Sequence, residues 1–213
     1  MDLKKLENKV KIIQNKFSAG QFDEVIVDVK LLLKKFSDQQ ILYNILSLSY
    51  QKKGENIKSI DLLTKAIKNT PNNILFLNNL GTSYYNIKNF EEAEYYFKRA
   101  LEINPKYITA INNLANLKYD LDLIDEAKKL YNQALELNND LLQPNYNLAS
   151  LNQTTGDFDK AIYHYKKVLK INPKFTKADR NISMMTKYSL ENEHFIEMKK
   201  KLNNKNLKNF EKL

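Results

Sequence analysis

Few side chains in this sequence of 213 residues could support catalysis. The chain has two histidines, His164 and His194, and no cysteine, which excludes disulfides, thiol nucleophiles and thiolate zinc sites. No HExxH, GxSxG or GK[ST] pattern occurs. The adjacent acids Glu91 and Glu92 do not face each other on a helix and suit a helix start instead. We therefore expect no catalytic residue, no metal site and no cofactor, and we predict that the chain is not an enzyme.

Amide side chains are the abundant polar groups. Asparagine occurs 28 times, and each amide offers donors and an acceptor that match the acceptor and the donor of a peptide bond. A column of asparagines can therefore hold an extended peptide by its backbone. Compositional bias alone would also scatter asparagine widely, in which case the amides are ordinary polar helix surface. Both interpretations stay open at this stage.

A period of 34 residues organises the chain. The period is marked by three prolines and three glycines, namely Pro71, Pro105, Pro173, Gly20, Gly54 and Gly156. The units that follow from it are 6–39, 40–73, 74–107, 108–141 and 142–175, with a sixth beginning at 176. A constant period of this kind indicates stacked repeats, in which neighbouring units bury one another's apolar faces.

Each unit contains two stretches with apolar residues recurring at three and four, as in Leu77, Leu80 and Tyr84. We therefore expect two helices per unit. Glycines 20, 54 and 156 fall between the two stretches, where a left-handed backbone conformation favours glycine. Asn89 and Asp157 precede the second stretch of their units and are expected to cap its N-terminus.

With the proline as position 32 of each unit, the pattern resembles the tetratricopeptide repeat (TPR) family. Small residues stand at positions 8, 20 and 27 and an aromatic at position 24, most completely in Gly81, Ala93, Phe97 and Ala100 of unit 74–107. The resemblance covers about residues 6–190. It implies an all-α fold, a right-handed α-solenoid of antiparallel helix pairs whose first helices line a concave groove. Such grooves commonly bind a protein or peptide partner.

The resemblance places several polar residues on that groove. Position 6 carries Asn79, Asn113, Asn147 and Asn181, and the neighbouring positions 5, 9 and 12 carry Asn78, Asn112, Asn116, Tyr85 and Tyr119. The asparagines look like the asparagine ladder in the TPR superhelix of O-linked N-acetylglucosamine transferase. The two tyrosines would either stack on a ligand side chain or pack against the neighbouring helix.

A second groove motif of the family, the clamp for a C-terminal carboxylate, is matched only in part. Asn112, Asn116, Asn147 and Lys177 stand at clamp positions, but an asparagine replaces the first lysine, and Arg180 lies one position early. We expect a weaker anion preference near Lys177 and Arg180, because a guanidinium pairs with a carboxylate through two hydrogen bonds.

Three segments are expected. Residues 1–39 form a degenerate first repeat or N-terminal cap, residues 40–175 form four TPR units, and residues 176–213 form capping helices and a basic tail. The net charge is +9, and the excess is greatest in the last segment, with nine basic and five acidic residues. That tail carries no motif for reading bases, so nucleic acid is the least favoured partner.

Two alternatives to a simple binding scaffold follow from these segments. The stretch 178–202 is similar to the linker that precedes the catalytic domain in bacterial TPR–sulfotransferase fusion proteins. This chain would then be the partner- or substrate-selecting region of a sulfotransferase- or glycosyltransferase-type enzyme. The positive charge motivates the other alternative, a nucleic-acid-associated helical repeat. The sequence shows neither a membrane span nor a signal-peptide core, so a cytoplasmic location is expected, and the oligomeric state stays open.

Overall fold

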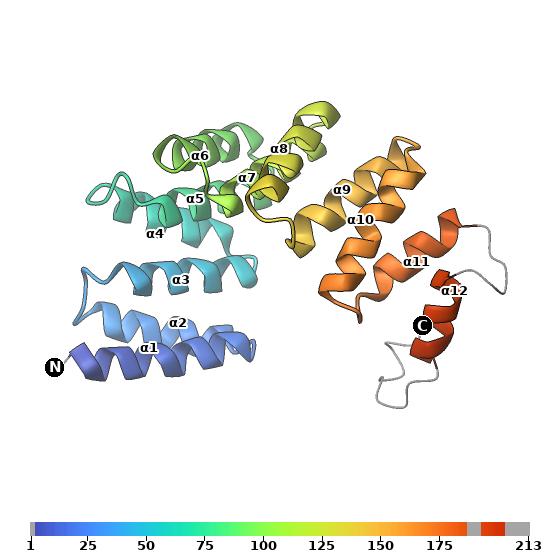
Figure 1. Cartoon of the computed structure of the whole chain (residues 1–213). Coiled ribbons are helices and arrows are strands. Elements are labelled where there is room, and N and C mark those ends of the chain that lie inside the picture. Colours follow the sequence, from blue (N-terminus) through green and yellow to red (C-terminus); the bar gives the residue numbers. More distant parts are fainter. Residues whose placement is uncertain (1–2, 187–192, 203–213) are drawn as a thin grey trace. The chain divides into compact units, whose positions relative to one another are not determined.

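The computed structural model describes residues 3–186 and 193–202, and within these ranges the chain forms twelve helices and no strand (Figure 1). The helices are α1 (Leu3–Ser18), α2 (Phe22–Leu33), α3 (Gln40–Lys52), α4 (Asn56–Ile67), α5 (Ile74–Asn86), α6 (Phe90–Ile103), α7 (Ile108–Asp120), α8 (Ile124–Leu137), α9 (Leu142–Thr154), α10 (Phe158–Ile171), α11 (Thr176–Met185) and α12 (Glu193–Leu202). The expected fold class, an all-α solenoid of helix pairs, is confirmed.

The 34-residue period of the sequence recurs in the helix boundaries. Successive first helices begin at Gln40, Ile74, Ile108, Leu142 and Thr176. Successive second helices begin at Phe22, Asn56, Phe90, Ile124 and Phe158. Equivalent residues of different repeats therefore occupy equivalent places on equivalent helices, so their surroundings can be compared directly.

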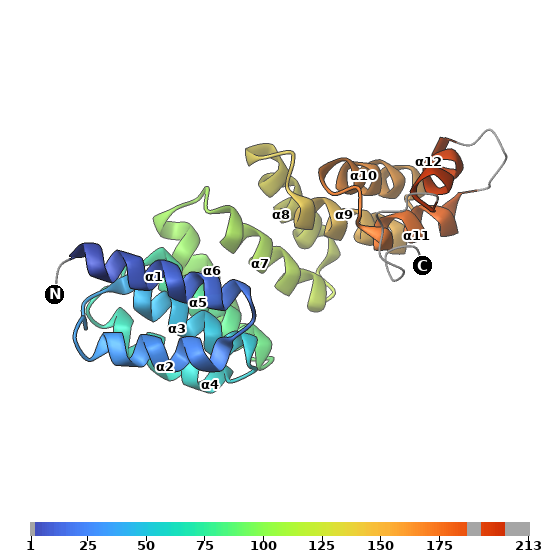
Figure 2. The same ribbon diagram turned by 90° about the horizontal axis from the view of Figure 1, so that it is seen from below.

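The chain divides into two compact units, residues 1–117 and 118–213. In the first unit each helix from α1 to α5 packs against the next, α5 packs against α6, and α3 also contacts the first helices α1 and α5 (Figures 1 and 2). In the second unit α9 packs against both α8 and α10, and α10 packs against α11. The N-terminal pair is part of the first core, because Leu6, Ile13 and Ile45 lie in one buried apolar cluster.

The turn inside each pair needs one residue with a left-handed backbone. Gly20, Gly54 and Gly156 have φ angles of +78°, +75° and +81°, as the sequence predicts. The repeat-equivalent residues of the other two pairs are Lys88 and Asp122, which adopt φ angles of 64° and 60°. The turn is thus set by the stacking of the two helices, and it persists where glycine is absent.

Side-chain oxygens cap the N-termini of two second helices, as expected. Oδ1 of Asn89 accepts from the Glu92 amide at 3.3 Å, and Oδ1 of Asp157 accepts from the Lys160 amide at 3.4 Å. Asn73 caps α5 in the same way, through the amides of Leu75 and Phe76, a role that the sequence analysis did not assign. These oxygens satisfy backbone donors that have no partner inside the helix.

The glycine at position 8 of unit 74–107 permits a close contact between the helices of its pair. Gly81 of α5 lies so close to Phe97 of α6 that a Cβ atom built on it would meet two ring carbons at 2.6 Å. Both residues are buried, and Phe97 is only 1 % exposed. The aromatic ring at position 24 therefore occupies the space that a larger residue at position 8 would take.

We predict that Gly81→Ala destabilises the chain by about 1–2 kcal/mol, because the overpacking of Phe97 outweighs the better helix propensity of alanine. Urea unfolding followed by circular dichroism measures the change. With Phe97→Leu in the background the sign should reverse, since the added methyl then has room.

Gly54→Ala is the control for the double-mutant cycle of Gly81→Ala and Phe97→Leu. Its Cβ would have no neighbour within 4 Å and its φ is +75°, so it should cost about 1 kcal/mol through backbone conformation alone. That cost should be the same with and without Phe97→Leu. Additive effects of Gly81→Ala and Phe97→Leu would contradict the proposed contact.

Candidate functional site

The asparagines of the first helices in residues 1–117 bond to one another. On α5, Nδ2 of Asn79 donates to Oδ1 of Asn44 on α3 at 2.6 Å, and Nδ2 of Asn78 donates to Oδ1 of Asn79 at 3.4 Å. On α7, Nδ2 of Asn113 donates to Oδ1 of Asn78 at 3.0 Å. The result is an unbroken chain of four amides that crosses three first helices, and each bond in such a chain polarises the next.

In residues 118–213 the same repeat positions bond to tyrosine. Nδ2 of Asn181 on α11 donates to the Tyr165 hydroxyl of α10 at 2.7 Å, and that hydroxyl donates to Gln153 at 2.9 Å. The Tyr131 hydroxyl of α8 hydrogen-bonds the Asn147 side chain of α9, and burial raises the pKa of this hydroxyl. Burial also raises the pKa of Tyr165. Both tyrosines therefore stay neutral and act as hydrogen-bonding groups.

The residue at position 24 of the preceding repeat explains why the asparagines bond to asparagine in residues 1–117 and to tyrosine in residues 118–213. Tyr131 and Tyr165 occupy this position before Asn147 and Asn181, and each supplies a hydroxyl. Leu63 and Phe97 occupy it before Asn79 and Asn113 and offer no polar atom. A buried amide without a partner is costly, so these two asparagines bond instead to an asparagine at position 5 of the preceding repeat, Asn44 or Asn78.

Burial separates the predicted groove asparagines into two groups. Asn78 and Asn79 are 4 % and 6 % exposed, so their amides chiefly hold neighbouring helices together. Asn112, Asn113, Asn116, Asn147 and Asn181 are half-buried. The Oδ1 atom of Asn112 is buried and accepts no hydrogen bond from the described residues. The half-buried amides are the ones with surface left for a ligand.

The two predicted groove tyrosines are half-buried. The Tyr85 ring packs against Phe90 with the ring centroids 5.8 Å apart, and Nζ of Lys88 lies 5.5 Å from the Tyr85 centroid. Tyr85 therefore packs beside the turn of its own helix pair, between α5 and α6. Tyr119 lies in the last turn of α7.

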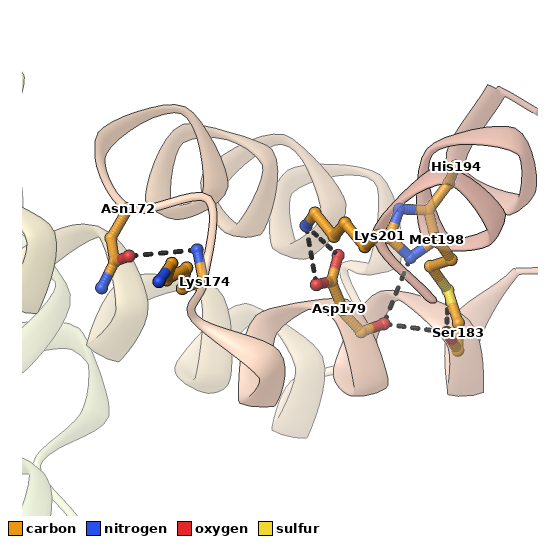
Figure 3. Close-up of polar contacts among 7 residues, drawn as sticks. All are labelled: Asn172, Lys174, Asp179, Ser183, His194, Met198 and Lys201. Carbon is orange, nitrogen blue, oxygen red and sulfur yellow. Dashed lines mark hydrogen bonds and ion pairs between the residues drawn. The ribbon is translucent and has the colours of Figure 1, made fainter. Parts of the chain in front are cut away.

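The predicted anion-preferring residues lie on α11. Lys177 and Arg180 are exposed, and Asp179 between them is buried. Both carboxylate oxygens of Asp179 accept from Nζ of Lys201 on α12, at 3.0 and 2.8 Å (Figure 3). The ion pair neutralises Asp179, so the exposed side of α11 keeps the positive charge of Lys177 and Arg180. Neither Asp179 nor Lys201 was predicted from the sequence to have a role.

Each histidine contacts a polar group of a neighbouring helix. Nδ1 of His164 lies 3.0 Å from Oδ1 of Asn145, and burial, followed by the nearby Lys167, lowers the pKa of His164. His194 is buried, and its Nε2 lies 3.2 Å from the backbone oxygen of Asp179, where it helps to hold α12 on α11 (Figure 3). Over residues 3–186 and 193–202, no three histidine, cysteine or acidic side chains gather as a metal site would require.

Helix α11 packs on the repeat before it, and α12 packs on α11. Ala178 and Ile182 of α11 lie in the buried cluster of α9 and α10. On α12, Met198 receives a hydrogen bond from Ser183 of α11 at 3.2 Å. The part of the expected basic tail from residue 203 onward lies outside the described residues. No helix in the described ranges combines the length and the apolar character needed to cross a membrane.

Helix pairs that repeat every 34 residues and bond through equivalent side chains define this chain as a helical-repeat protein. Two profiles of the tetratricopeptide repeat match it, over residues 74–107 and 106–174. The chain belongs to the tetratricopeptide-repeat family, whose repeats generally mediate protein–protein interaction.

Solved structures give the same fold. A thermophilic TPR protein from Thermus thermophilus aligns with a TM-score of 0.75 and 20 % identity, covering 84 % of this chain and 97 % of its own. The pilF protein of Pseudomonas aeruginosa aligns with a TM-score of 0.70 and 18 % identity, covering 81 % and 79 %. The MamA protein aligns with a TM-score of 0.59 and 26 % identity, covering 66 % and 82 %. No curated protein sequence matches the chain significantly.

We predict that Asn79→Ala destabilises the chain by about 1–3 kcal/mol, because it leaves the amides of Asn44 and Asn78 without their partner at a buried position. The free energy of unfolding in urea is the readout. Asn69→Ala, in the exposed turn after α4, should change stability by less than about 0.5 kcal/mol. Equal effects of the two substitutions would show that the amide chain has no structural role.

A second stability prediction concerns Asn152 on α9. Its side chain is 1 % exposed, and neither Nδ2 nor Oδ1 has a hydrogen-bond partner among the described residues. The isosteric change Asn152→Leu should therefore stabilise the chain by about 1 kcal/mol, by removing an unpaired buried amide. The melting temperature followed by circular dichroism tests this, and a lower melting temperature for Asn152→Leu would contradict it.

Proposed function

We propose that this chain is a non-enzymatic scaffold whose first helices bind an extended segment of a partner protein. The observation that carries the proposal is the orientation of the half-buried asparagines. Asn113 and Asn181 use Nδ2 to bond a neighbouring helix, while their Oδ1 atoms accept no hydrogen bond from any described residue. These oxygens suit the backbone N–H groups of a bound peptide.

The buried amides support this surface from behind. Asn78 and Asn79 are positioning residues in the proposal, because their hydrogen bonds fix the side chain of Asn113 and the spacing of α3, α5 and α7. Asn112, Asn116 and Asn147 complete the set of amides proposed to contact the ligand. Tyr85 and Tyr119 would contact its side chains.

Lys177 and Arg180 add positive charge to the part of the proposed surface that lies in residues 118–213. Both are exposed on α11, and the acid between them is neutralised by Lys201. An acidic side chain or a C-terminal carboxylate of the partner segment would be favoured there, since arginine pairs with carboxylates through two parallel hydrogen bonds.

Site-specific photo-crosslinking identifies the face that the partner contacts. We predict that a photoreactive phenylalanine analogue at Tyr85 or Tyr119, both at position 12 on first helices, captures a partner protein in cells. The matched controls are Tyr95 and Tyr163, which stand at position 22 on second helices and are 49 % and 54 % exposed.

The two sets of positions share their residue type, so the comparison depends on the face alone. Capture at Tyr95 and Tyr163 with none at Tyr85 and Tyr119 would overturn the assignment of the binding face. Where capture occurs at position 12, Asn113→Ser and Asn181→Ser should reduce its yield, because serine shortens the side chain that reaches the ligand backbone.

A further inference from the structure

Exposed aliphatic side chains border a recess between α1 and α2, the first helix pair of residues 1–117 (Figures 1 and 2). The recess has a volume of about 190 Å³ and is lined by Lys9, Ile12, Ile13, Asp28, Leu31 and Leu32. Ile13 and Leu32 are buried, whereas Ile12 and Leu31 are each 56 % exposed. Val27, one turn before Leu31 on α2, is 57 % exposed. The pair α1–α2 therefore presents an apolar face to solvent.

The later repeats show how this face is usually covered. Ile12 stands at position 7 of its repeat, and the residues at position 7 of the later repeats are at most 5 % exposed, namely Leu46, Leu80, Leu114, Leu148 and Ile182. The first helices α3, α5, α9 and α11 each pack against the second helix of the preceding repeat. Among residues 3–186 no such helix precedes α1, and Ile12 stays uncovered.

Leu31 departs from the repeat pattern in its residue type. The other four repeats carry a polar residue at this place, position 26, namely Lys65, Arg99, Gln133 and Lys167. A single exposed apolar side chain is common on any protein surface. Ile12, Val27 and Leu31, however, belong to one helix pair, and two of them border the same recess. A contiguous apolar patch with polar residues beside it is typical of a protein interface.

The two ends of the recess carry opposite charge. At the end near the turn of the pair, Nζ of Lys16 lies 2.8 Å from Oδ2 of Asp28 and 3.0 Å from Oε2 of Glu24, so that two acids share one cation. Lys9 stands seven residues before Lys16, about 10 Å further along α1. Lys9 is exposed and forms no ion pair with any described residue. Ile12 lies between the negative end and the positive end.

We propose that this face binds the same face of a second copy of the chain, in a dimer with two-fold symmetry. A patch that is apolar in its middle and oppositely charged at its ends is complementary to itself. Rotation about a two-fold axis through the middle places Lys9 of each copy opposite Asp28 of the other. Ile12 and Leu31 of each copy then reach the recess of the other. A cavity of about 150 Å³ already holds a benzene-sized group, so the recess has room for an aliphatic side chain.

The size of the face predicts a weak and reversible dimer. Helix α1 has 16 residues, which makes it about 24 Å long, and two helices side by side are about 20 Å wide. Each copy thus offers about 500 Å², and the total of about 1,000 Å² lies at the lower end of specific interfaces. We therefore expect a dissociation constant in the micromolar range. None of the lining residues belongs to the asparagine columns, so this proposal and the proposed function can fail independently.

Sedimentation velocity of the full chain, from about 1 to about 500 μM, measures the association directly. Monomer and dimer should exchange reversibly, and no species should be heavier than the dimer. A chain that stays monomeric over this whole range would overturn the proposal. Assemblies that grow beyond the dimer would overturn it as well, because they require a head-to-tail contact, which does not close.

Lysine substitutions test the apolar part of the face. Ile12→Lys and Leu31→Lys should each weaken dimerisation about 10-fold or more, because each buries a charge in the interface. Leu31→Lys introduces the residue that two other repeats have at position 26, so the variant should fold, which circular dichroism checks. The matched control is Ile57→Lys on α4. Ile57 is 58 % exposed and does not line the recess, so this variant should dimerise within about twofold of the parent chain. Equal losses from Ile12→Lys and Ile57→Lys would overturn the proposed face.

A charge reversal tests the two-fold arrangement. Lys9→Glu places an acid opposite Asp28 of the second copy and should weaken dimerisation about 10-fold at low salt. The matched control is Lys11→Glu. Lys11 is exposed on the same helix but does not line the recess, and its reversal changes the net charge equally. This control should change dimerisation by no more than about twofold. Equal losses from the two reversals, or undiminished dimerisation of Lys9→Glu, would overturn the two-fold arrangement.

Discussion

Stacking in this protein depends on the side chain at position 24, which is buried in all five helix pairs from α1 to α10 and, in the pair α5–α6, packs directly against Gly81 at position 8. Val29, Leu63, Phe97, Tyr131 and Tyr165 are all at most 1 % exposed. No unit can bury its apolar face alone, so this contact also fixes the distance at which the next pair of helices must lie. A polar side chain on a first helix can therefore form hydrogen bonds only with groups that this spacing brings close enough.

The asparagine columns illustrate that dependence. Where position 24 is a tyrosine, its hydroxyl meets the amide of the next first helix, as between Tyr165 and Asn181. Where position 24 is phenylalanine, the amide of Asn113 turns to Asn78 instead. In both cases the asparagine amide already forms a hydrogen bond between neighbouring helices, and only its remaining atoms are available to a ligand. The asparagines of these columns are therefore structural residues first, and the proposed binding surface consists of the atoms that those hydrogen bonds leave unused.

Equivalent backbone positions do not imply equivalent surfaces. Tyr50 and Tyr84 occupy the same place in successive repeats, but the Tyr84 ring stacks on Tyr96, while Tyr50 is buried and has Nζ of Lys30 and Nζ of Lys58 over its ring. The residue at position 23, leucine in one repeat and tyrosine in the next, changes which side chains lie against the position-11 ring. Successive repeats can thus differ in their surface chemistry without altering the fold, because each repeat contacts only its neighbours.

The repeat, its 34-residue register, the glycine turns and two of the N-caps were predictable from the residues alone, because each follows from spacing and from local backbone preferences. The all-α solenoid was implied by the resemblance to the TPR family. The same spacing placed Asn79 and Asn181 in one column, but it could not distinguish a buried amide from a half-exposed one. No sequence pattern predicts the pairing of Asp179 with Lys201, the unpaired amide of Asn152, or the recess lined by Ile12 and Leu31. These features emerge from the packing of the helices, because the partner of a side chain on one helix lies on another helix, and its identity depends on how the two fit together.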